Sequence, residues 1–90
     1  MKLLIIAYAL NNNFRDYTPF YDAVKNNSVK WWHFLDSIYI VSTTSSPDQY
    51  AKLLLPYIET TDRLLVYRLQ NDKQGWLPRA AWDWLNSQTH

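Results

Sequence analysis

The chain contains no cysteine and only one glycine among its 90 residues. Without cysteine it forms neither a disulfide framework nor a thiolate nucleophile, which fits a protein of the reducing cytoplasm. A single glycine cannot build the glycine-rich phosphate loops of Rossmann, kinase or P-loop proteins. Nine basic and eight acidic side chains give a net charge of +1, so the basic excess typical of nucleic-acid-binding proteins is missing as well.

Long hydrophobic runs are absent too. The longest opens the chain, from Lys2 to Leu10, and it is far too short to span a bilayer. It resembles a signal peptide only superficially, because Asn11 to Asn13 follow at once and no small-residue cleavage site is present. We therefore expect a central strand buried on both faces and no membrane association.

What the chain does have is apolar and aromatic side chains. Hydrophobic residues make up 48% of the sequence, with five Trp, seven Tyr and three Phe. A chain this short buries a smaller fraction of its surface on folding than a longer chain does, and large aromatic side chains increase the apolar area that it can bury. No linker or internal boundary is visible, so residues 1–90 are predicted to form a single domain.

Two helices are predicted from caps and periodicity. Thr18-Pro19 is typical of an N-cap followed by a first-turn proline, and this helix should end at Asn26-Asn27. The second begins at Ser46-Pro47-Asp48-Gln49, which has the pattern of a capping box. Its apolar residues then recur at helical spacing, at Ala51, Leu54, Leu55 and Ile58.

Three further strands are predicted at residues 29–35, 37–44 and 62–70, with Asp36-Ser37 as the hairpin turn between the first two. A short helix containing Ala81, Trp84 and Leu85 ends the chain. This order indicates an α+β fold, the ferredoxin-like β-α-β-β-α-β arrangement with a four-stranded antiparallel sheet and a C-terminal helix. Both crossover helices then lie on one sheet face. The other face is an association surface unless the C-terminal segment or a second subunit covers it.

Few side chains are candidates for chemistry. His33 is either a general base or phosphate contact at a dimer groove, or a surface residue of its strand opposite a buried Trp. Asp36 and Ser37 are either turn formers or, near the tip of the first strand, part of a divalent-ion site. The two histidines, His33 and His90, lie far apart in the sequence, so no zinc site is expected.

The basic side chains are scattered along the chain. Interleaved with exposed aromatics they would line a nucleic-acid surface, and otherwise they form an ordinary mixed surface. They are Arg15, Lys25, Lys30, Arg63, Arg68, Lys73 and Arg79.

Several blocks of the sequence carry a resemblance to a known group. They are Tyr8-x-Leu10 with the polar loop Asn11–Asp16, Tyr17 and Tyr21, Trp31-Trp32-His33-x-Leu35-Asp36-Ser37, Ile40-Val41, Asp62-x-Leu64-Leu65-Val66, Trp76-Leu77-Pro78 and Ala81-Trp82-Asp83-Trp84-Leu85. With these blocks the chain resembles the small SinR-like proteins of bacteria and mobile elements. That group is related in turn to virulence-associated protein D and to small CRISPR-associated adaptation-type nucleases.

The resemblance implies a homodimer formed over the open sheet face. In the nuclease members an Asp ends the first strand, and two such residues hold Mg²⁺ or Mn²⁺ at the dimer axis, where the metal activates water. The matching position here is Ala9, whose methyl group binds no metal. Three explanations stay open: a naturally inactive protein, an inactivated form, or an active acid elsewhere.

Three functions remain as hypotheses. The first is a metal-dependent nuclease-like domain acting on RNA, DNA or short oligonucleotides, present in a form that lacks its central acid at Ala9. The second is a non-catalytic dimeric module that binds nucleic acid or a protein, and the third is a toxin-type ribonuclease. We take His33 and Ser37, with the Ala9 position, as catalytic candidates. Nucleic-acid contacts are expected at Tyr8, Asn11, Arg15 and Lys30.

Overall fold

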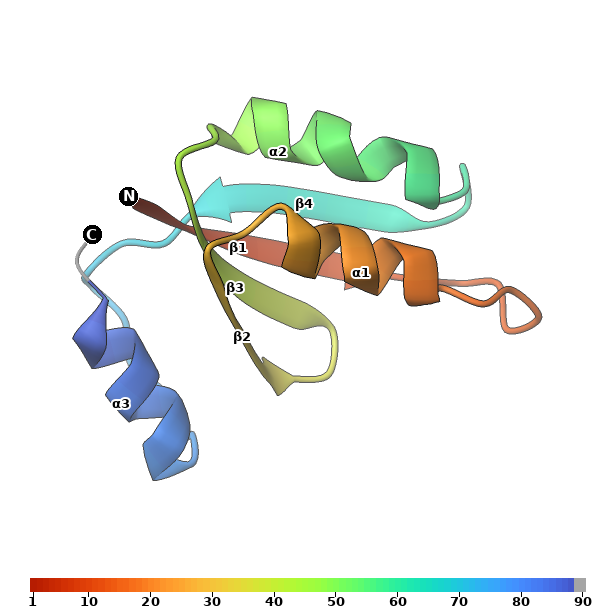
Figure 1. Cartoon of the computed structure of the whole chain (residues 1–90). Coiled ribbons are helices and arrows are strands. Elements are labelled where there is room, and N and C mark those ends of the chain that lie inside the picture. Colours follow the sequence, from red (N-terminus) through yellow and green to blue (C-terminus); the bar gives the residue numbers. More distant parts are fainter. Residues whose placement is uncertain (89–90) are drawn as a thin grey trace.

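The computed structural model describes residues 1–88 (Figure 1). Along the chain the elements are β1 (Lys2–Ala9), α1 (Thr18–Asn26), β2 (Lys30–Leu35), β3 (Ile38–Thr43), α2 (Pro47–Leu54), the 3-10 turn η1 (Leu55–Tyr57), β4 (Arg63–Arg68) and α3 (Arg79–Ser87). All strand pairs are antiparallel, and their order in the sheet is β2-β3-β1-β4. The predicted α+β class and four-stranded antiparallel sheet are therefore confirmed.

Strand β1 occupies an inner position, because it pairs with β3 on one side and with β4 on the other. Leu3 and Leu4 point to opposite faces, and both are almost completely buried. Farther along β1 the burial alternates, so that Ala7 is half-buried and Ala9 is exposed. The prediction of a strand buried on both faces is thus correct for its first half only, because one face is left open toward its end.

The larger hydrophobic core lies between the sheet and the helices α1 and α2, which Figure 1 shows on the same side. Even-numbered residues of β1 pack there against Phe20 of α1 and Tyr50 of α2, both with no exposed surface. Burial of a large apolar side chain contributes roughly 1.5–3 kcal/mol, so these residues dominate the stability of this layer. The Ser46 and Gln49 capping box that starts α2 is formed as predicted.

A smaller core lies on the opposite face of the sheet. There α3 packs through Ala81 and Leu85 onto Leu3, Trp32 and Ile40. The Trp32 indole nitrogen donates a hydrogen bond of 3.2 Å to the carbonyl oxygen of Ala81, which ties α3 to β2. The C-terminal helix therefore packs on its own sheet, and it covers only the part of this face near the start of β1.

The second half of β1 and the adjoining β4 leave an apolar surface open. Ile5 and Ala7 of β1 lie opposite Tyr67 and Leu65 of β4. Leu65 is 60% exposed and Tyr67 is 43% exposed, although both are apolar strand residues. We call these four residues the open sheet face.

Some sequence predictions need correction. Thr18 is the first residue of α1 and not its N-cap, which is Tyr17 with no side-chain cap. The Asp16 carboxylate instead accepts hydrogen bonds from the Thr18 amide and hydroxyl, at 2.9 and 2.6 Å. Trp76 is fully exposed, whereas the aromatic side chains were expected to pack. His90 lies outside the described residues.

No helix within the described part of the chain is both long and apolar enough to cross a membrane.

Candidate functional site

The loop after β1 and the loop before β4 meet at one end of the sheet, and one buried carboxylate holds them together. Asp62 is only 6% exposed. Its two oxygens accept hydrogen bonds from the Asn11 and Glu59 amides, each 2.8 Å long. The Tyr17 hydroxyl lies 2.9 and 3.0 Å from the same two oxygens. Asp62 therefore connects the loop after β1, the start of α1 and the loop before β4.

The electrostatics of Asp62 favour its ionised form. Burial by itself would raise the pKa of this carboxyl, but the hydrogen bonds from the Asn11 and Glu59 amides and the Tyr17 hydroxyl, with Arg15 nearby, hold the pKa below its usual value. With these donors already bound, Asp62 acts as a structural anchor in this arrangement.

The charges of Arg15, in the loop after β1, and Glu59, in the loop before β4, neutralise each other. Arg15 forms an ion pair of 3.2 Å with Glu59 and donates to the carbonyl oxygen of Tyr57. Asn12 donates to both carboxylate oxygens of Glu59, at 3.3 and 3.2 Å. Arg15 and Glu59 are each about one-third exposed, so this pair adds at most a modest stabilisation, roughly 1 kcal/mol.

A second cluster lies where the β2–β3 turn meets the end of β1. The Tyr8 hydroxyl donates to the carbonyl oxygen of Asp36 at 3.0 Å and lies 3.2 Å from Nε2 of His33. Nε2 of His33 also lies 3.3 Å from the carbonyl oxygen of Asp36, and the tautomer of the ring decides which group donates in these contacts. The His33 ring stacks on Tyr39 with centroids 3.9 Å apart.

Burial raises the pKa of Tyr8, and the neighbouring Tyr21, Tyr39 and Asp36 raise it further. Tyr8 therefore keeps its proton at physiological pH and acts as a hydrogen-bond donor. The same turn contributes Ser37, whose carbonyl oxygen accepts a hydrogen bond of 3.1 Å from the Tyr8 amide. This cluster brings together the His33 imidazole, the Tyr8 and Tyr39 rings and the backbone carbonyls of Asp36 and Ser37.

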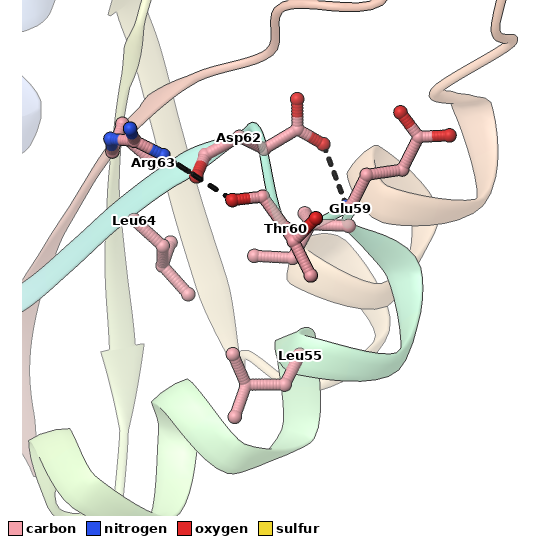
Figure 2. Close-up of a pocket in the computed structure, with 7 residues that line it drawn as sticks. Leu55, Glu59, Thr60, Asp62, Arg63 and Leu64 are labelled. Atoms are coloured by element: carbon pink, nitrogen blue, oxygen red, sulfur yellow. Dashed lines mark hydrogen bonds between the residues drawn. The ribbon is translucent and has the colours of Figure 1, made fainter.

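The Ala9 position lies on the other side of the sheet. Ala9 is paired with Arg63 of β4 and shares the open face with Ala7 and Leu65. These residues, with Tyr8 and Leu64, line a shallow hollow of about 300 Å³. A second hollow of about 410 Å³ lies between η1 and the start of β4, and Figure 2 shows Arg63, Thr60 and Leu55 on its walls. Arg63 and Leu64 line both hollows.

The predicted site residues are thus divided among four places. Tyr8, His33 and Ser37 come together at the β2–β3 turn, whereas Ala9 is on the opposite sheet face. Asn11 and Arg15 belong to the polar network around Asp62. Lys30 begins β2, at the edge of the sheet farthest from β4, where it is paired with Ser42.

Sequence reasoning did not single out Asp62, Glu59 or Arg63 as site residues. Arg63 was included only among the scattered basic side chains. Its importance depends on the strand register that places it opposite Ala9, and that register joins positions 54 residues apart in the chain. A polar residue directly before an apolar strand was the one local signal for Asp62.

The side chains present do not fit a divalent metal ion. No group of three or more His, Asp or Glu side chains within residues 1–88 is arranged to hold one. Asp62 already accepts hydrogen bonds from three groups, and Glu59 is paired with Arg15. Every buried side-chain nitrogen or oxygen in this part of the chain also has a partner. We therefore derive no metal-dependent step for this form of the protein.

Comparison with protein-family models, with curated proteins and with solved structures gives no match for this chain. Its function must be argued from the geometry described above.

Proposed function

We propose that this chain is a nuclease-like domain that binds nucleic acid as a homodimer, in a form without the central carboxylate carried by the nuclease members of the group that it resembles. One observation carries the proposal: Ala9 ends β1 on the open sheet face, exposed and beside the unneutralised Arg63. A second copy placed over this face would bring the two Ala9 positions to a shared surface. We also propose a cytoplasmic location, in agreement with the cysteine-free sequence.

The finer fold assignment is part of the proposal. The strand order β2-β3-β1-β4, with one helix after β1 and one after β3, supports a ferredoxin-like arrangement. In that arrangement both crossover helices cover the same face, as α1 and α2 do here (Figure 1). The opposite face is then available for association wherever α3 does not cover it.

The proposed dimer is supported by the open sheet face. Its four residues are contiguous across β1 and β4, and they carry no charge. Large exposed apolar patches mark interaction sites, and here Leu65 and Tyr67 are exposed beside the half-buried Ile5 and Ala7. We assign this surface to a second copy of the chain, because two identical uncharged sheet faces are complementary to each other and one charged group, Arg63, lies only at their margin.

The dimer is tested by measuring the mass in solution. We expect a dimer for the unchanged protein, and a monomer for Leu65→Lys, which places a charge at the centre of the open sheet face. Leu53→Lys is the matched control, because Leu53 of α2 is 42% exposed and lies away from this face. A monomeric unchanged protein, or equal behaviour of the two variants, contradicts the proposed dimer.

The nuclease-like ancestry is tested at position 9. Ala9→Asp would restore a carboxylate where the relatives have one, and we expect Mg²⁺- or Mn²⁺-dependent cleavage of single-stranded RNA, DNA or a short oligonucleotide to appear with it. Ala7→Asp is the control, since it puts the same group on the same face two residues earlier. Cleavage by neither variant, with oligonucleotide binding intact, favours the non-catalytic module.

One observation favours a second candidate, the toxin-type ribonuclease. The His33 imidazole is held by a hydrogen bond with Tyr8. Imidazole is the side chain that most often carries out general acid–base catalysis. This activity would persist in EDTA and disappear in His33→Asn. RNA cleavage that requires a divalent ion, or none at all from the unchanged protein, contradicts this candidate.

A further inference from the structure

We propose that Arg63 is the phosphate-contacting residue of the nucleic-acid site, and that it binds one phosphodiester group at the hollow between η1 and the start of β4. This inference rests on the proposed function and deepens it, because it names the residue and the ligand group. The relevant chemistry is that of a phosphate monoanion or diester, whether it comes from an oligonucleotide or from a free phosphate.

The charge of Arg63 is not neutralised within the described residues. The ion pairs of residues 1–88 join Arg15 with Glu59, Lys52 with Asp48 and Arg79 with Asp83, and none includes Arg63. The two carboxylates close to it in the sequence are both engaged: Asp62 by Tyr17 and two amides, Glu59 by Arg15. The cation is therefore left to attract an anion from solution.

The guanidinium of Arg63 is also held in place. Its Nη1 donates to the carbonyl oxygens of Asp62 and Thr60, at 3.0 and 3.4 Å, as Figure 2 shows. Both acceptors are neutral, so they orient the group without cancelling its charge. Nε and Nη2 make no hydrogen bond within the described part of the chain and remain to form the parallel pair of bonds that arginine makes with phosphate.

The surroundings of Arg63 have room for such a ligand. Arg63 lines the hollow of about 410 Å³ between η1 and the start of β4, and none of the residues around this hollow belongs to the open sheet face. Its walls carry apolar groups, among them Leu55 and Leu64, on which a sugar or a base can lie. Across the strand pair stands Ala9, whose small neutral side chain neither blocks the approach of an anion nor competes for the guanidinium.

Arg63 fits this role better than Arg15, which the sequence had suggested. Arg15 has a carboxylate partner at 3.2 Å, and a phosphate would have to displace it. Arg63 has no such competitor. Because Arg63 has no carboxylate partner, it gives a local positive charge. A net charge of only +1 for the whole chain is therefore compatible with anion binding at this residue.

The test compares Arg63→Ala with Arg68→Ala, which removes the same charge from the other end of the same exposed strand. Binding of a short single-stranded oligonucleotide is measured over a series of salt concentrations. We expect Arg63→Ala to weaken binding about tenfold at low salt and to lower the salt dependence by about one phosphate contact, with Arg68→Ala within about twofold of the unchanged protein. Arg63→Lys should be intermediate, since it keeps the charge but loses the paired geometry.

A second measurement separates this inference from the proposed function. Inorganic phosphate is titrated into the unchanged protein while backbone amide resonances are followed, and we expect saturable shifts at Ala9, Thr60 and Arg63 that Arg63→Ala abolishes. Equal, small effects of the two alanine variants on oligonucleotide binding overturn the role of Arg63 and leave the nucleic-acid module standing. Phosphate shifts without oligonucleotide binding support the anion site and overturn the proposed function. The absence of any phosphate shift overturns the anion site.

Discussion

Replacement of Asp62 by alanine is expected to be the most damaging single change outside the hydrophobic cores. It leaves the amides of Asn11 and Glu59 and the hydroxyl of Tyr17 without their acceptor. A buried donor without a partner costs about 1–3 kcal/mol, and a bond to a charged acceptor is among the stronger ones. Because the two loops are partly open to water, we count about 1 kcal/mol for each amide and about 1.5 kcal/mol for the hydroxyl.

The sum predicts a loss of about 3–4 kcal/mol for Asp62→Ala. Protein domains have a free energy of unfolding of roughly 5–15 kcal/mol. The variant should therefore remain folded, but with a small remaining free energy of unfolding. Urea denaturation followed by tryptophan fluorescence measures this directly, and with a typical slope the midpoint should fall by about 2 M. Asp72→Ala is the matched control, because Asp72 is an exposed carboxylate in the loop after β4.

The pH dependence provides an independent check on Asp62. Its pKa is lower in the folded state than the ordinary value of 3.8, so its contribution is complete above that value and is lost as the pH falls through the lower folded pKa. Asp62→Asn should flatten the acid loss of stability in that window, and Asp72→Asn should not. A loss below about 1 kcal/mol for Asp62→Ala, together with an unchanged acid profile for Asp62→Asn, would refute the anchoring role.

Three further changes test other parts of the fold. Tyr50→Phe removes the 2.8 Å hydrogen bond to the Val24 carbonyl and should cost about 1 kcal/mol in urea denaturation; because burial raises the pKa of Tyr50 to about 12, it should also reduce the stability loss between pH 10 and 12. Ser46→Ala breaks the capping box with Gln49 and should cost about 1 kcal/mol by the same assay, whereas a change below about 0.3 kcal/mol would contradict the cap. Trp32→Phe removes the bond to α3, and hydrogen exchange should then become faster in α3 but not in α2.

The elements of this chain were predictable where one local signal was sufficient. The capping box at Ser46 defines the start of α2 without help from the rest of the chain. The apolar periodicity predicted too long a helix, because α2 ends at Leu54, a 3-10 turn follows it, and Leu55 is 54% exposed. The turn at Asp36 and Ser37 likewise follows from local chemistry, and the four strands differ from the predicted ranges by no more than two residues at either end.

The cap of α1 was predicted wrongly because two local patterns compete there. Thr18 before Pro19 has the composition of a cap, but Asp16 lies two residues earlier and binds the Thr18 amide and hydroxyl itself. The turn that Asp16 forms satisfies those groups and lets Thr18 enter the helix as its first residue.

The candidate site was less predictable than the fold because it depends on long-range register. Sequence alone pointed to the end of β1, and this region does gather polar groups. The alternation of side chains along a strand already places Tyr8 and Ala9 on opposite faces of the sheet, but the sequence could not show which residues each of them meets there. Nor could it show that Asp62 is bound by Tyr17 while Arg63, the next residue, has no carboxylate partner.

Asp62 and Arg63 have different roles because β4 begins between them. Asp62 precedes the strand, where its carboxylate turns into the loops and satisfies three donors that no strand ladder reaches. Arg63 is the first residue of the ladder and points to the open face beside Ala9. One carboxylate therefore stabilises the end of the sheet, and the cation next to it remains free to meet a ligand. An acid introduced at position 9 would face that cation directly and would compete with an anion from solution for it.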